Sequence, residues 1–158
     1  MDYRKPIHDK LITDFTALTF DGTAINLFTE VKKLFVVEPE DLPVCRITST
    51  GLRVEIDGNT HNTRLLGFVA DTFDSIPLDN ISQEDAEKRI DRLSNIEDSV
   101  LAYLSKLPNN IEHEVGTIHI YDMQVEQTSY QYQSGERGIE VMLSIPFTLK
   151  LSITPQLL

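Results

Sequence analysis

The clearest pattern along the chain is a strict alternation of apolar and polar positions near its C-terminal end. Apolar residues occupy every second position from Ile139 to Leu151, and mostly polar residues stand between them. A two-residue period over thirteen positions predicts a β-strand, because no helix satisfies it. Residues 114–133 also favour extended structure, and a glycine-bearing turn at 134–138 predicts that the two segments form a long hairpin. Pro146 has no N–H donor, so we expect this strand to lie at a sheet edge or to bulge there.

Residues 82–107 carry the second strong pattern, which is helical. Apolar residues recur at intervals of three, four and seven. They form one stripe, with Ile96 beside it: Ala86, Ile90, Leu93, Val100, Leu104 and Leu107. Ser82 is placed to cap the N-terminus, with Asp85 three residues later. Pro108 and the Asn pair after it end the helix. A single apolar stripe predicts that this helix lies on a sheet.

The N-terminal half predicts one helix and several strands. Residues 6–18 have apolar positions at helical spacing, and Pro6 suits a first helical turn. Residues 23–37 fit neither period, but the β-branched residues near Val36 and Val37 favour one or two short strands. Three strand segments follow, the last two joined by a tight turn at Asp57-Gly58-Asn59: 44–48, 52–56 and 64–73.

Together these elements predict an α+β fold. We expect a mixed or antiparallel β-sheet with a long amphipathic helix packed on one face, an N-terminal helix and a long C-terminal β-hairpin. A chain of 158 residues has the length of one domain. No linker, repeat or low-complexity tract divides it, so we expect a single domain over residues 1–158.

Charge and composition narrow the function classes. The chain has 25 acidic and 14 basic residues, a net charge of −11. Such a surface repels phosphate, and the basic groupings are only pairs, so specific nucleic-acid binding is disfavoured. No run approaches the length of a membrane span, and the N-terminus does not resemble a signal peptide, so we expect cytoplasmic synthesis and no membrane partner. The single cysteine, Cys45, lies in an apolar stretch and is expected to be buried rather than reactive.

Candidate chemistry is sparse. The sequence has no nucleotide-binding glycine loop, nucleophile elbow or zinc-protease motif. Glu112, His113 and Glu114, with His119 nearby, offer nitrogen and oxygen ligands, but a strand would turn His113 away from the two glutamates. We therefore expect surface polar residues here, no enzyme activity, and neither a cofactor nor a metal.

Two aromatic residues are candidates for contact with a partner. Tyr130 and Tyr132 share one strand face near the expected hairpin tip. They either anchor an interface or cover the long helix, and the sequence favours neither. Exposure and reach add four residues of the two turns as interface candidates: Glu136, Arg137, Asp57 and Asn59.

The element order as a whole resembles a known family. Its features are the Leu42-Pro43 entry to a central strand, the helix at 82–107 and the long alternating strand that closes the chain. In these features, over about residues 7–151, the chain is similar to the tail terminator proteins of long-tailed bacteriophages, also called tail-completion or minor tail proteins.

The resemblance implies a structural virion protein at the head-proximal end of the tail. Such a subunit forms a hexameric ring that caps the tail tube, ends tube polymerisation and offers a docking face to the head-completion or neck protein. Its partners are copies of itself, the tail tube protein and the neck protein, and DNA passes through the lumen without specific binding. Long edge strands suit contacts between subunits. An acidic lumen lets DNA slide past, because phosphate binding needs cations.

Two alternatives stay open. The chain is also compatible with a head–tail connector or stopper protein of the neck. From another class, a small ferredoxin-like binding or regulatory module would be a compact monomer or dimer with a shorter final hairpin. Fold analogy alone does not decide between them.

Overall fold

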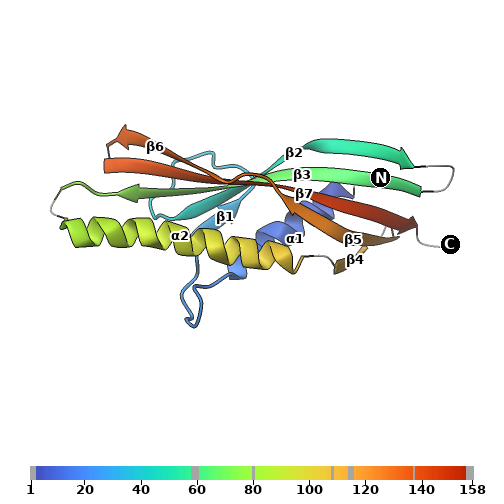
Figure 1. Ribbon diagram of the computed structural model, residues 1–158, viewed down its shortest axis with the longest axis horizontal. Helices are drawn as coiled ribbons and strands as arrows, with labels where there is room; N and C mark the ends of the chain where they lie inside the picture. Colours follow the sequence, from blue (N-terminus) through green and yellow to red (C-terminus); the bar gives the residue numbers. More distant parts are fainter. Residues whose placement is uncertain are drawn as a thin grey trace.

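The computed structural model describes residues 3–57, 61–79, 81–107, 109–113, 116–136 and 138–155. These residues form two helices and a seven-stranded mixed sheet (Figure 1). The element order is α1 (Arg4–Ala17), β1 (Glu30–Lys32), β2 (Val44–Asp57), β3 (His61–Ile76), α2 (Gln83–Ser105), β4 (Asn109–His113), β5 (Gly116–Val125), β6 (Ser129–Gly135) and β7 (Gly138–Pro155). The expected α+β class and C-terminal hairpin are confirmed.

The sheet has the order β1-β2-β3-β7-β5-β4, and β6 also pairs with β7. β1 runs parallel to β2, and the other paired strands are antiparallel. β7 pairs with β6 over Gly138–Ser144 and with β5 over Phe147–Pro155. On the side of β7 away from β3, the sheet therefore ends in two edge strands, β6 and β4, at opposite ends of β7.

The expectation that Pro146 places β7 at an edge or in a bulge is wrong. β7 pairs with β3 on one side and with β6 and β5 on the other. The Pro146 carbonyl accepts a hydrogen bond from the Glu126 N–H, in the stretch that connects β5 to β6. In an antiparallel strand the N–H and C=O of a residue point to the same side. The missing N–H of Pro146 therefore faces the gap between two partner strands, where it interrupts no ladder.

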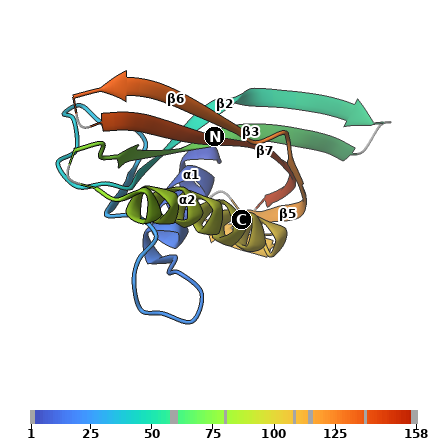
Figure 2. The same cartoon turned by 60° about the vertical axis from the view of Figure 1, so that its left-hand side comes forward.

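The hydrophobic core lies on one side of the sheet. The odd-numbered positions of β7 from Leu143 to Leu151 are buried, as the alternation predicts, together with Leu66 and Phe68 of β3. α1 adds three buried residues to this cluster and α2 also adds three: Ile7, Leu11, Phe15, Ile96, Val100 and Leu104. Figures 1 and 2 both show α1 and α2 on the same side of the sheet. We call the opposite side the outer face.

α2 begins as the sequence predicts. The Asp85 N–H donates to the Ser82 side-chain oxygen at 3.1 Å, so Ser82 is the N-cap. The predicted stripe is shifted, because Ile96 is fully buried while Ile90 is 44% exposed. The first turns of α2 contact only a small cluster around Leu93 rather than the main core. An apolar residue in these turns therefore has less of the protein to cover it.

Two segments of the N-terminal half differ from expectation. The strands expected at 44–48 and 52–56 are one strand, β2, with a bulge between Ser49 and Gly51. Gly51 has φ of +131°, which favours glycine. An extra residue in a strand shifts the side-chain alternation by one position, so the sequence suggests a break where the backbone continues.

In the region 23–37 one short strand is present, β1, as expected, but Val36 and Val37, whose β-branched side chains favoured a strand, lie outside it. β4 was not expected, because the Asn pair after Pro108 was interpreted only as a helix stop. The partner that makes it a strand is β5, with Asn109 opposite Ile120.

Candidate functional site

A groove opens on the outer face, at the end of the sheet where β6 and β7 turn. It has a volume of about 370 Å³ and lies between the loop after β1 and the β6–β7 hairpin. Side chains of both segments and of the central strands line it: Phe35, Glu38, Pro39, Leu42, Val44, Arg46, Phe73, Asp74, Gln131, Tyr132, Gln133, Glu140, Val141 and Met142. We call it the Arg46 groove.

A polar cluster crosses three strands beside this groove. In the register of the sheet, Arg46 of β2 is opposite Asp71 of β3, which is opposite Ser144 of β7. Arg46 Nη2 donates to Asp71 Oδ2 at 2.9 Å, and Ser144 Oγ donates to Asp71 Oδ1 at 2.6 Å. The Arg46 guanidinium also lies 5.1 Å from the centre of the Phe73 ring.

Asp71 is buried, so its carboxylate needs these donors. Arg46 Nε is buried without a hydrogen-bond partner. The cluster holds a partly exposed guanidinium, paired with Asp71, at a fixed position in a groove that three carboxylates and two amides also line. A guanidinium that is already paired suits a neutral acceptor on a protein partner, such as a backbone carbonyl.

Beside the groove, the chain exposes a run of large apolar residues. Leu34, Val36 and Val37 are 64%, 90% and 78% exposed, whereas Phe35 is half-buried and lines the groove. We call residues 34–37 the apolar segment. Its side chains also border a second hollow with Glu30 and Lys32 of β1. Single exposed apolar residues are ordinary, but contiguous ones mark a contact surface.

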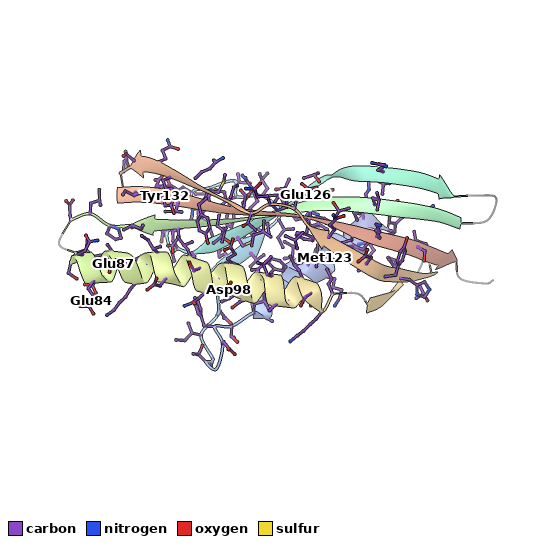
Figure 3. The ribbon with its side chains drawn as sticks, viewed as in Figure 1. Glu84, Glu87, Asp98, Met123, Glu126 and Tyr132 are labelled. Atoms are coloured by element: carbon purple, nitrogen blue, oxygen red, sulfur yellow. The ribbon has the colours of Figure 1, made fainter. Side chains whose placement is uncertain are left out.

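The two tyrosines of the predicted interface have different surroundings. Their rings stack, with centroids 6.5 Å apart and planes at 14°. Tyr130 donates from its hydroxyl to Glu97 Oε1 of α2 at 3.1 Å, and burial together with Glu97 raises its pKa to about 12. Figure 3 labels Tyr132 on β6. Its side chain is 58% exposed. Tyr130 thus covers the helix, one of the two roles left open, while Tyr132 is available to a partner.

The other predicted interface residues do not gather at one place. Glu136 is exposed in the β6–β7 turn, and Asp57 ends β2 opposite His61. Arg137 and Asn59 lie outside the described residues. The register puts the Gly135–Gly138 pair, where β6 and β7 meet, and the Asp57–His61 pair, where β2 and β3 meet, at opposite ends of the sheet, and Figure 1 shows these strand ends far apart. A single contact with one partner therefore does not span both turns.

The structure describes three of the four residues that the sequence offers as metal ligands. Glu112 and His113 belong to β4, and His119 of β5 is opposite Asn110. Glu114 lies outside the described residues. Where the structure describes the chain, no three His, Cys, Asp or Glu side chains form a cluster that could hold a metal ion.

Cys45 is fully buried in the core, which confirms its interpretation as a small buried residue. Burial raises the pKa of its thiol, so the thiolate needed for reactivity is disfavoured.

Polar contacts between distant elements also hold the fold together, and two of them were not predictable from the sequence. Arg92 of α2 binds both carboxylate oxygens of Asp74 on β3, with Nη2 to Oδ1 at 2.5 Å and Nε to Oδ2 at 3.1 Å. His8 Nε2 of α1 lies 2.6 Å from the carbonyl oxygen of Ile47. No local sequence pattern indicates either contact, because the two residues of each pair are 18 and 39 positions apart along the chain.

Comparisons with known proteins do not identify the chain. No family model matches the sequence, and no curated protein matches it. Among the described residues, neither helix is long and apolar enough to cross a membrane.

Proposed function

We propose that this chain is a structural subunit that works by assembling into a ring, as a phage tail terminator does. In this proposal a ring of six copies caps the tail tube, ends its polymerisation and offers a docking face to the neck. α2 is the long amphipathic helix packed along one face of the sheet, and the outer face and the sheet edges are left for neighbouring subunits. The observation that carries the proposal is the exposed apolar segment 34–37 beside the open Arg46 groove.

The physical support is surplus contact surface. A monomer that exposes Leu34, Val36 and Val37 together leaves apolar area in water that an assembly would bury. The described sheet also ends in a strand, β6, that pairs on one side only. Open strand edges pair readily with other chains. A head-to-tail ring uses two different surfaces on each subunit, and it closes without leaving either one unused.

The charge of the chain fits the same role. Six copies would surround DNA with a strongly acidic ring, since each carries −11. Phosphates would gain no counterion release on such a wall, so DNA would pass without binding. The partners under this proposal are copies of the chain, the tail tube protein and the neck protein.

The test is to measure the oligomeric state and then the capping of tubes. Purified protein should sediment as ring-sized oligomers, or form rings on tail tubes seen by negative-stain electron microscopy. The double variant Val36→Ser, Val37→Ser should lose assembly. The matched control is Ile25→Ser, which changes another exposed apolar residue outside the segment and should keep assembly. A protein that stays monomeric and does not bind tail tubes would overturn the proposal.

The Arg46 groove favours a second candidate, a small binding module that receives a peptide through its backbone carbonyl groups. That candidate predicts a monomer or dimer whose ligand binding is lost in Arg46→Gln. A neck connector or stopper, by contrast, also forms rings. It would bind a head protein rather than the end of the tail tube.

A further inference from the structure

The apolar segment has the composition of a strand without a partner. Leu34-Phe35-Val36-Val37 begins two residues after the end of β1 at Lys32, and its β-branched and aromatic residues favour extended structure. β1 nevertheless ends at Lys32, and Leu34, Val36 and Val37 remain exposed. Among the described strands, none lies beyond β1 to pair with such an extension.

β6 has the opposite property: it is an edge strand, and no described strand pairs with its open side. The whole stretch 127–135 is uncharged and has no proline. The edges at β1, β2 and β4 are protected, because β1 is short and carries Glu30 and Lys32, β2 is bulged at Gly51, and the five-residue β4 carries Glu112. Short strands, charges and bulges are the usual protections of an edge, and β6 has none of them.

The backbone groups that β6 offers can be assigned from the register. The Pro146 carbonyl faces the β5–β6 side of β7, so the even-numbered residues of β7 point their backbone groups toward β6. Gln131 and Gln133 of β6, which are opposite Met142 and Glu140, therefore direct their backbone groups toward β7. The backbone groups of Tyr130, Tyr132 and Ser134 therefore point to the open side.

The apolar segment after β1 and the open edge of β6 lie at the same level of the sheet, at its opposite edges. One row of paired residues runs Glu30, Val44, Phe73, Met142 and Gln131, from β1 across β2, β3 and β7 to β6. β1 is parallel to β2, and three antiparallel pairings follow, so β1 and β6 run in opposite directions. Copies arranged side by side around an axis would bring β1 of one next to β6 of the next in antiparallel orientation.

We propose that residues 33–37 of one copy add as an antiparallel strand to the open edge of β6 in the next copy. This inference rests on the proposed ring-forming function and names its contact. Residues 34–37 and 127–135 are both uncharged, and Lys33 at the start of the added strand is basic, so the contact brings no acidic side chain between subunits that each carry −11. A head-to-tail contact satisfies the apolar segment and the β6 edge together, whereas a two-fold contact of β6 with itself would leave the segment exposed.

Proline at position 132 tests the strand pairing. Tyr132→Pro removes an N–H that points to the open side, and it leaves the β6–β7 ladder intact. It should weaken assembly about tenfold or more, the effect of a lost interface hydrogen bond with added steric hindrance. The matched control Tyr132→Val keeps the N–H and a strand-forming side chain and should assemble. An unchanged urea midpoint for the monomer would show that each variant folds.

Cross-linking gives a second readout that does not depend on the proline variant. Val36→Cys and Gln133→Cys, mixed in equal amounts with a short bis-maleimide, should give covalent dimers, and each alone should not. The double variant should give a ladder up to the size of the ring. Cys45 is buried and should not react.

The outcomes separate the strand contact from the ring. If the wild type assembles, Tyr132→Pro assembles equally well and positions 36 and 133 do not cross-link, the strand pairing is overturned and the ring function stands. Cross-linking of Gln133→Cys alone would show a two-fold contact of β6 and would also overturn the pairing. A wild type that is monomeric and inactive on tail tubes overturns both.

Discussion

Charged side chains inside this protein have assigned partners on other elements. The Asp74 side chain is 1% exposed and is bound by Arg92 of α2 and by the backbone N–H of Ser75. A buried carboxylate is tolerated only because these donors replace water. The Asp74–Arg92 pair thereby fixes the position of α2 along β3.

Removing one partner should therefore be costly. Asp74→Ala leaves the Arg92 guanidinium, which is 26% exposed, without its counter-charge. We expect the free energy of unfolding to fall by about 3 kcal/mol, at the lower end of the range for a broken buried pair because Arg92 can turn toward solvent. Urea denaturation measures the loss. Glu84→Ala, at a side chain that is 80% exposed, is the control and should change stability by less than about 0.5 kcal/mol. Equal losses in both variants would contradict the role of the pair.

His8 makes stability depend on pH. Burial lowers the pKa of His8 from its ordinary value of 6.5, although the hydrogen bond to Ile47 opposes the shift. The unfolded chain therefore takes up a proton at a higher pH than the folded chain. The contribution of neutral His8 is fully present above pH 6.5 and is lost as the pH falls toward the lowered folded pKa.

We expect the wild type to lose more stability between pH 7.5 and 5.5 than His8→Gln. Gln keeps a donor near the Ile47 carbonyl but does not titrate. Unfolding midpoints of both proteins at several pH values test this, since the difference between them isolates His8. Parallel pH profiles would show that His8 does not contribute.

Among the elements, the β6–β7 hairpin depends on its turn. Gly138 has φ of +113°, and a Cβ at this position would clash with the carbonyl oxygen of Ile76. Glycine therefore serves here both for its backbone conformation and for its lack of a side chain. This turn holds β6 in register, so the edge offered to a partner depends on it as well.

Gly138→Ala should destabilise the protein by about 2 kcal/mol or more, from backbone strain and the clash together. The matched control is Gly22→Ala. Gly22 also has a positive φ, +72°, but a Cβ there would meet no atom within 4 Å. The control should cost only about 1 kcal/mol of strain. Thermal or urea unfolding measures both variants, and an equal cost would show that Ile76 is not an obstacle.

At the scale of the whole molecule, net charge disfavours association of copies, whereas the exposed contact surface favours it. Copies that each carry −11 repel at low ionic strength, while the apolar segment and the β6 edge favour association. Dissolved salt weakens the repulsion over distances beyond about 10 Å at 0.1 M and leaves apolar contacts in place.

Assembly should therefore strengthen when sodium chloride rises from about 0.02 M to 0.5 M, where screening is nearly complete. Sedimentation velocity at a constant protein concentration measures the shift. The double variant Val36→Ser, Val37→Ser provides the control, because it should remain monomeric at both salt concentrations. Assembly that weakens with salt would show that ion pairs between subunits, rather than uncharged segments, hold the ring together.

Elements whose pattern is local were predictable from the sequence. The alternation over 139–151 specified a strand with its odd-numbered side chains inward, and Ser82 specified the start of α2. Both depend on neighbours within a few residues, so the chain encodes them directly. The buried state of Cys45 followed in the same way from its apolar surroundings.

The candidate site could be predicted only in fragments. Exposure and reach predict Tyr132, which lines the groove, but composition predicts a strand for the apolar segment at the opposite edge of the sheet, where the structure has none. The Arg46–Asp71–Ser144 cluster joins three strands that are 25 and 73 residues apart, and no local spacing signals it.

The sequence by itself determined the two helices and the long alternating strand β7, because side-chain periodicity arises from local backbone geometry. Only the tertiary structure decided the strand order, the interior position of Pro146, and which edges remain open. These depend on pairings between distant segments, and a residue such as Val36 has the same local propensity whether or not a partner strand is available. Its exposure follows from the absence of a neighbouring strand in the described fold.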